Sequence, residues 1–236
     1  MPKIFKQNIR KIGYKLDETD FNNLELILKE VNDTNTSNTI SYSIREKNNE
    51  ISNGLDLSQL LKQPNIGESA IERITVYSNY LGDDSITIEF TVYGKNPIVY
   101  NLSFLNKNNL RDYEEQLDNY IESIKTDYSF ISVSPLLKTL LTIFISFIIT
   151  RIIISIFILL GAPSFVTEYP FNINIYSVLM TFFGLFIVRF MNKIYPIADF
   201  SIGIGKKVSE QIKNYRKLAY SVFILPILPI IIEKFI

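Results

Sequence analysis

The stretch TLLTIFISFIITRIIISIFILL, residues 139–160, decides the architecture of this chain. It contains one charged residue, Arg151, near its middle. A bilayer core of about 30 Å requires roughly 20 mainly apolar residues in a helix, and this stretch has that length. Backbone groups in hydrocarbon must be hydrogen-bonded within the segment, so we predict an α-helix in spite of the β-branched isoleucines. The sequence therefore predicts a membrane protein.

Two further apolar segments follow. Residues 175–190 predict a second span, which is slightly short unless residues 172–174 and Arg189 lie at opposite interfaces. The third segment, from residue 219, is short and is broken by two prolines. It crosses the membrane, enters it and returns, or lies in the interface, and we favour crossing or deep insertion. We therefore expect an α-helical membrane domain of two to three spans.

Basic residues set the predicted orientation. Residues 161–174 contain no Lys or Arg, whereas residues 191–218 are rich in both. Because Lys and Arg stay on the cytoplasmic side, the basic segment and the N-terminal domain are predicted to be cytoplasmic. Frequent Asn, Ile and Lys are typical of an AT-rich bacterial genome, so the expected location is the bacterial plasma membrane, a cell inner membrane. The residues expected to contact anionic lipid headgroups are Lys193, Lys206, Lys207, Lys213, Arg216 and Lys217.

The N-terminal residues predict a cytosolic α+β domain. Amphipathic patterns indicate helices over residues 18–31 and 109–127. Alternating β-branched and aromatic residues indicate an antiparallel sheet of about four strands, with the helices on one face. These strands lie near residues 40–44, 71–80, 85–93 and 98–104. Residues 1–16 mix basic and apolar side chains, and we interpret them as an arm or edge that docks on the domain; the alternative is contact with an anionic membrane surface.

The chain is thus divided into four predicted parts. They are a cytosolic α+β domain at 1–129, a transmembrane helical hairpin at 130–190, a basic cytoplasmic juxtamembrane segment at 191–218 and a short apolar third membrane segment at 219–236.

Arg151 is the strongest single-residue signal. An arginine inside a membrane helix costs at least about 2.5 kcal/mol and usually has a partner. At about 1.5 Å per residue, Glu233 reaches the same depth as Arg151 if the third segment crosses. We expect these two membrane-embedded charges to pair in that case; otherwise Arg151 snorkels outward or pairs between subunits.

Composition excludes several chemistries. Cys, His and Trp are absent, which removes disulfides, Cys nucleophiles, Cys/His zinc sites and histidine relays. The net charge is zero, so nucleic-acid binding is not expected. Residues 203–207 lack the spacing of a phosphate-binding loop, and the acidic residues near 17–20 and 83–84 suit caps and turns. We predict no enzyme activity, no catalytic residue, no metal and no cofactor.

From Pro196 the chain reads PIADFSIGIGKKVSEQIKNYRKLAYSVFILPILPIII. Pro196, Phe200, Gly203, the basic helix with Arg216 and the final apolar stretch together resemble the tail of a group of uncharacterised bacterial membrane proteins with a cytosolic N-terminal domain. The resemblance implies no activity. A cytosolic α+β module on a small helical membrane domain is also similar in architecture to effectors and accessory proteins of bacterial antiphage defence, that is, antiviral defence.

Two functions are considered on this basis. The first is a multi-pass membrane protein whose cytosolic domain binds a protein partner or a small ligand, with the helices as anchor. The alternative is a homo-oligomeric effector that permeabilises the membrane when the cytosolic domain is triggered, with Arg151 lining a polar path.

Overall fold

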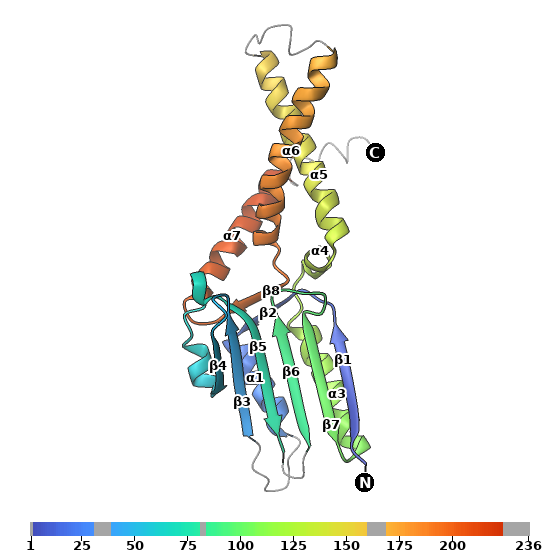
Figure 1. The fold of residues 1–236 in the computed structure, drawn as a ribbon, viewed down its shortest axis with the longest axis vertical. Helices are drawn as coiled ribbons and strands as arrows, with labels where there is room; N and C mark the ends of the chain where they lie inside the picture. Colours follow the sequence, from blue (N-terminus) through green and yellow to red (C-terminus); the bar gives the residue numbers. More distant parts are fainter. Residues whose placement is uncertain (1, 31–38, 81–83, 160–168, 224–236) are drawn as a thin grey trace. The chain divides into compact units, whose positions relative to one another are not determined.

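The computed structural model describes residues 2–30, 39–80, 84–159 and 169–223. The chain forms two compact units. The first comprises residues 1–133 together with the segment from residue 196 onward, and the second comprises residues 134–195 (Figure 1). The second unit is therefore an insertion within the first, because both of its ends lead into the same folded unit.

The first unit is built on a six-stranded antiparallel sheet of order β1-β7-β6-β5-β3-β4. Its strands are β1 (Ile4–Arg10), β3 (Thr39–Glu46), β4 (Ile51–Leu55), β5 (Ile71–Asn79), β6 (Ser85–Thr91) and β7 (Ile98–Phe104). The α+β class and the antiparallel sheet are confirmed, but the predicted number of four strands is wrong. The two missed strands, β1 and β4, are the sheet edges, where burial is partial and the alternation of apolar side chains is weak.

Strand β1 is an edge of the sheet, one of the two forms expected for the N-terminus, and Ile12 and Tyr14 after it pack on the core, but the apolar side chains of β1 itself do not dock. Its apolar side chains point outward, since Phe5 is 69% exposed and Ile9 is 42% exposed. Its polar side chains face the helices instead. In β1 the apolar side chains therefore face solvent and the polar ones face the helices, the reverse of an ordinary half-buried strand. The apolar pattern alone did not predict this strand for that reason.

Helices α1 (Glu18–Glu30) and α3 (Lys107–Ser123) lie on one face of the sheet, as predicted (Figure 1). The apolar stripes of both helices face alternate residues of the strands, and these side chains form the core. Phe21 of α1 meets the ring of Tyr42 edge-on at 6.1 Å, and Tyr113 of α3 stacks on Phe104 at 5.1 Å. Short elements complete this part, namely α2 (Leu57–Leu61), the 3₁₀ turn η1 (Gly67–Ser69) and α4 (Ser129–Val133).

The second unit is a hairpin of two long helices, α5 (Pro135–Leu159) and α6 (Tyr169–Ile194). Within them, Pro135–Ile156 and Ser177–Ile194 are long and apolar enough to cross a membrane. Only 22% and 17% of the residues in these stretches are buried, which is far less than in a core helix of a soluble protein. Helix α6 begins before the predicted span, so residues 169–174, expected in the connecting loop, are helical.

Small side chains lie where the two hairpin helices pack. Thr142, Ser146 and Thr150 follow one another at four-residue spacing on α5 and are all buried. On α6, Gly184 faces this row, because a Cβ placed on it would lie 3.8 Å from Ser146 Oγ. Small residues allow membrane helices to approach closely, so this row accounts for the pairing of α5 with α6.

The chain after the hairpin returns to the first unit. Strand β8 (Ala198–Ser201) pairs in parallel with β2 (Tyr14–Asp17), and α7 (Gly205–Phe223) follows. The sequence-based division treated residues 191–218 as a separate juxtamembrane segment, whereas the structure places residues 196–218 in the α+β unit. A pairing between two four-residue strands this far apart leaves no local signature. Helix α7 extends into the predicted third segment as far as Phe223, and the rest of that segment, with Glu233, lies outside the described residues.

Candidate functional site

Strand β2 and the residue before it, Gly13, form hydrogen bonds with the segments that precede and follow the hairpin. Its amide groups point alternately to two neighbours. The amide of Tyr14 donates to Ile197 O at 2.9 Å, in the segment that follows α6. The next amide, that of Lys15, donates to Ile124 O at 3.0 Å, at the end of α3. One short strand therefore bridges the segments that lead into and out of the hairpin.

The connection that leads into α5 is fixed on Gly13. The amide of Gly13 donates to Ser129 Oγ at 2.8 Å, and its carbonyl accepts from the amide and the hydroxyl of Thr126 at 3.0 and 3.1 Å. A Cβ at this position would collide with Ser132 Oγ and would lie 3.1 Å from the Cα of Ser129. Glycine is thus required here because α4 packs directly on the backbone.

The connection that leaves α6 is fixed in the core. Tyr14 is fully buried, and its ring lies 5.7 Å from that of Phe90 and 6.1 Å from that of Phe200 on β8. Its hydroxyl donates to Thr91 O at 3.1 Å. Burial raises the pKa of Tyr14 well above its ordinary value, so the ring stays neutral. Strand β8 is therefore part of the hydrophobic core and not a surface appendage.

The turn between β8 and α7 is held by the loop after α2. Asn65 donates its side-chain amide to Phe200 O at 2.5 Å and accepts from the amide of Ile71 at 2.8 Å. Gly203 has a φ of +52°, and a Cβ there would collide with the carbonyl of Gln63. The glycines of residues 203–207 thus serve a close backbone approach.

Helix α7 is docked on the unit by two contacts. Ser209 donates to the buried carboxylate of Asp199 at 2.7 Å. The guanidinium of Arg216 lies over the ring of Tyr128, 4.2 Å from its centroid, which is a cation–π contact. Burial raises the pKa of Tyr128 to about 12, although the charge of Arg216 acts in the opposite direction. The structure thus gives Arg216, expected at lipid headgroups, a contact inside the protein.

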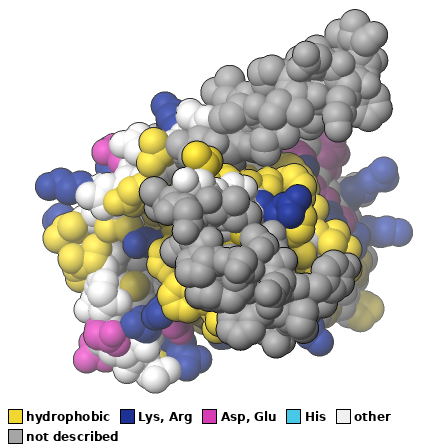
Figure 2. Space-filling view, turned by 90° about the horizontal axis from the view of Figure 1, so that it is seen from above, with side chains coloured by type: hydrophobic (Ala, Val, Ile, Leu, Met, Phe, Trp, Pro, Cys, Tyr) yellow, Lys and Arg dark blue, Asp and Glu magenta, His cyan; other side chains and the backbone are white. Residues whose placement is uncertain are grey.

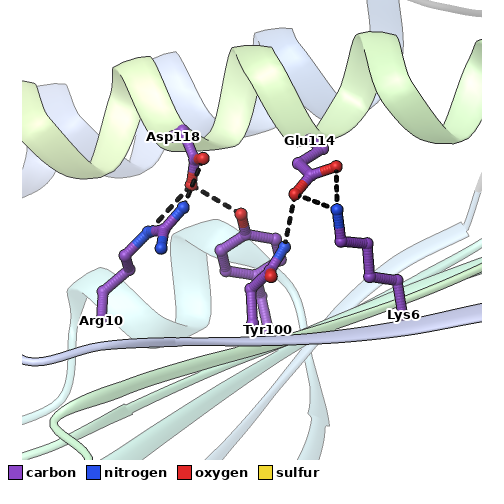
Figure 3. Close-up of polar contacts among 6 residues, drawn as sticks. Lys6, Arg10, Tyr100, Glu114 and Asp118 are labelled. Atoms are coloured by element: carbon purple, nitrogen blue, oxygen red, sulfur yellow. Dashed lines mark hydrogen bonds and ion pairs between the residues drawn. The ribbon is translucent and has the colours of Figure 1, made fainter.

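The polar residues of β1 form a network with α3, which we call the edge clamp (Figure 3). It consists of Lys6, Asn8, Arg10, Tyr100, Glu114 and Asp118. Lys6 Nζ donates to Glu114 Oε2 at 2.6 Å, and Asn8 donates to Glu114 Oε1 at 3.0 Å. Arg10 binds Asp118 through two nitrogens, with Nε at 3.0 Å from Oδ1. The hydroxyl of Tyr100 donates to the same Oδ1 at 2.6 Å.

The hydrogen bonds of the edge clamp change the pKa of the Asp118 carboxyl. Burial alone would raise the pKa of this carboxyl, but the hydrogen bonds from Arg10 and Tyr100 outweigh burial, and the pKa lies below its ordinary value. Both carboxylates of the clamp accept hydrogen bonds from β1. The network therefore holds the edge strand on α3 and lacks the strained, proton-sharing arrangement of an acid–base site.

The opposite face of the sheet is mainly polar, although Phe5 and Ile9 on the edge strand β1 are exposed there, and it is not covered by a helix of the described residues (Figure 1). We call it the open face. Five neighbouring strands place side chains in register across its middle, in the order Gln7, Asn101, Thr87, Tyr77 and Ser41. In the described part of the chain, Asn101 Oδ1 and Arg45 Nε on this face are buried atoms without a hydrogen-bond partner. Such atoms favour a polar partner on this surface.

The predicted membrane and lipid residues lie on three helices. Arg151 is exposed on α5, with its guanidinium 5.9 Å from the ring centroid of Phe147. Lys193 is exposed near the end of α6. Four more lysines are exposed on α7, namely Lys206, Lys207, Lys213 and Lys217. Because Glu233 is outside the described residues, its pairing with Arg151 stays a prediction.

Comparisons with protein-family models, curated proteins and solved structures find no match. The geometry must therefore carry the functional argument. Within residues 2–30, 39–80, 84–159 and 169–223, no group of three or more Asp or Glu side chains is placed to hold a metal ion. Sequence reasoning missed the junction at β2, because neither Gly13 nor β8 belongs to a motif or a periodic pattern.

Proposed function

We propose that this chain is a two-span bacterial membrane protein whose cytoplasmic α+β unit binds a protein partner or a small polar ligand and transmits that event to the helical hairpin. One observation carries the proposal. The two connections of the hairpin are fastened on consecutive residues, Gly13 and Tyr14, through bonds to Ser129 and Ile197.

This fastening limits the topology. Both hairpin ends leave one folded unit, so they lie on one side of a membrane that the hairpin crosses. An even number of crossings is then required between residues 134 and 195, and α5 and α6 provide two. The absence of Lys and Arg from residues 161–174 supports an external position for the end of the hairpin between α5 and α6.

The fastening also supports transmission. A displacement of Gly13 and β2 would move α4 and β8 together, because α4 bonds to Gly13, directly before β2, and β8 pairs with β2. The open face is the proposed binding surface, and its strands β6 and β7 bear the residues that pack on Tyr14 and α3. A ligand that binds one arrangement of this core more tightly than another shifts the equilibrium between the two arrangements, and the size of the shift is set by the difference in affinity. The hairpin would follow that shift.

Labelling of single cysteines tests the topology, since the chain has no native cysteine. Lys11→Cys, Ser164→Cys and Lys213→Cys are each exposed to a membrane-impermeant maleimide in intact cells and after permeabilisation. We expect labelling from outside at residue 164 alone. Opposite sides for residues 11 and 213 would contradict the proposal, because β2 and β8 then could not pair.

The effector function remains a second candidate because Arg151 is exposed on α5. It lies roughly 24 Å along the helix from Pro135 at 1.5 Å per residue, within a bilayer core of about 30 Å. A charge at that depth requires a polar partner or a route to the far interface. Overexpression that depolarises cells, abolished by Arg151→Leu with insertion intact, would favour the effector over the binding module.

A further inference from the structure

Helix α7 has an exposed apolar stripe that the rest of the described unit does not cover. Ile204, directly before the helix, and Val208, Tyr215 and Leu218 within it lie at spacings of four, seven and three residues, on one side of the helix, and are 53%, 42%, 49% and 62% exposed. The helix face that packs on the unit is a different one, formed by Gly205, Ser209, Ile212 and Arg216. Large apolar side chains gathered on one stripe indicate a surface that something else covers.

Charge identifies the occupant. Helix α7 carries five basic residues and one acidic residue, Glu210. Among the basic residues, Arg216 is used to dock the helix, which leaves four exposed lysines for an external partner. Two copies of such a helix would repel each other, whereas an anionic lipid surface attracts each of them. Exposed hydrophobic side chains lie beside Lys and Arg side chains in Figure 2.

The connection to α6 makes this surface accessible. The ten residues 195–204, which include β8, join the two helices, so α7 follows α6 closely along the chain. On α7, Lys207 lies beside the apolar stripe, where its long side chain can extend toward headgroups, whereas Lys206, Lys213 and Lys217 lie on the opposite side of the helix.

We propose that α7 is an interfacial helix that inserts Ile204, Val208, Tyr215 and Leu218 into the headgroup region of an anionic bilayer. This inference rests on the proposed function, because the hairpin must first place the protein in a membrane. It assigns the lipid contact to the apolar stripe with Lys207 beside it, and it assigns Arg216 to holding the helix on the protein. The α+β unit is then attached to the membrane at a third place besides the two ends of the hairpin.

Polarity-sensitive fluorophores on the full chain test this placement. Val208→Cys and Leu218→Cys are labelled with NBD, reconstituted in nanodiscs of phosphatidylcholine with or without phosphatidylglycerol, and compared with Lys213→Cys on the opposite side of α7. A fourth probe at Ile143→Cys on α5, where Ile143 is 52% exposed, reports insertion of the hairpin. We expect blue-shifted, quencher-protected emission at residues 143, 208 and 218 and aqueous emission at 213.

Charge variants test the headgroup chemistry. Changing Lys207, beside the stripe, to Gln lowers the ratio of inserted to free α7 by about fivefold in phosphatidylglycerol discs, and Lys213→Gln, on the opposite side of α7, has a smaller effect. Lys11→Gln, Lys95→Gln and Lys107→Gln, exposed lysines elsewhere on the unit, serve as matched controls and leave the ratio unchanged.

Each of the other emission results would contradict either the interfacial helix, the membrane hairpin or lipid as the occupant of the stripe. Aqueous emission at 208 and 218 with lipid-like emission at 143 would disprove the interfacial helix and leave the proposed function standing. Aqueous emission at 143 would disprove the membrane hairpin itself. Self-quenching between labelled copies at 208, independent of phosphatidylglycerol, would show that a second copy covers the stripe and not lipid.

Discussion

The backbone amide of Gly13 donates a hydrogen bond of 2.8 Å to the hydroxyl of Ser129, 116 residues later in the chain. The next residue, Tyr14, donates to the segment after the hairpin. Two consecutive amides thus bond to the segments that precede and follow the inserted unit. Under the proposed function, substitutions at Gly13 and Tyr14 are the ones expected to affect coupling most.

Gly13→Ala is expected to destabilise the α+β unit by about 1–3 kcal/mol, because the added Cβ collides with Ser132 Oγ and crowds the backbone of Ser129. Thermal unfolding in detergent measures the loss. Ser132→Ala removes only the hydroxyl, so alone it should be nearly neutral, and together with Gly13→Ala it should restore part of the stability. Full stability of Gly13→Ala would show that α4 does not pack on this residue.

The parallel pairing of β2 with β8 is testable by cross-linking. Asp17 and Ser201 are register partners, and the chain has no native cysteine to interfere. With a protease site inserted among residues 161–168, the Asp17→Cys/Ser201→Cys pair should hold the two cleaved halves together on a non-reducing gel. Asp17→Cys/Thr87→Cys is the control, and cross-linking that is no better than in this control would contradict the pairing.

How far the sequence predicts this structure depends on whether a signal is local. The two long apolar helices and the stripes of α1 and α3 were predictable, because the length of an apolar run and the periodicity within one segment are local signals. Strand β8, with the four residues ADFS all buried, shows no alternation, and its partner lies more than 180 residues away. In β1 the inward side chains are Lys6, Asn8 and Arg10, so an apolar pattern points to the wrong face.

Acid should weaken the edge clamp. The folded-state pKa of Asp118 lies below its ordinary value of 3.8, so the stabilisation is present above that value and is lost as the pH falls through the lower folded pKa. Asp118→Asn removes the charge that Arg10 binds and should cost about 1 kcal/mol at neutral pH, given the partial exposure of the pair.

Unfolding as a function of pH measures this effect, and the difference between Asp118→Asn and the unchanged protein should shrink in acid. Glu122→Gln is a matched control on the same helix, because Glu122 pairs with Lys125 at an exposed position. An equal effect of the two substitutions would show that the clamp contributes no more than a surface pair.

A large, positively charged side chain at the centre of the open face should prevent the proposed partner from binding there. Thr87 lies at the centre of the register row between Asn101 and Tyr77, and Thr87→Arg places a long cation there without touching the core. A photo-cross-linker at residue 41 should capture a partner in cells, and Thr87→Arg should reduce capture at least tenfold. Lys107→Glu, on α3 across the sheet, is the control; equal loss in both would argue against this surface.

A substitution at Thr150 distinguishes two roles for the buried row of Thr142, Ser146 and Thr150. The row either packs α5 against α6 or lines a polar path. Its side chain is fully buried, and among the described residues its hydroxyl has no hydrogen-bond partner. Thr150→Val has the same shape without the hydroxyl, so helix packing predicts equal or greater stability of the hairpin, by up to about 1–2 kcal/mol. A polar path through an oligomer predicts the reverse, because the hydroxyl would then contact water or ions.

Denaturation of the reconstituted protein measures the effect on stability, and dye release from vesicles measures the polar path. Reduced stability with lost dye release would favour the effector, whereas gained stability with no release from either protein would leave the row as packing between α5 and α6.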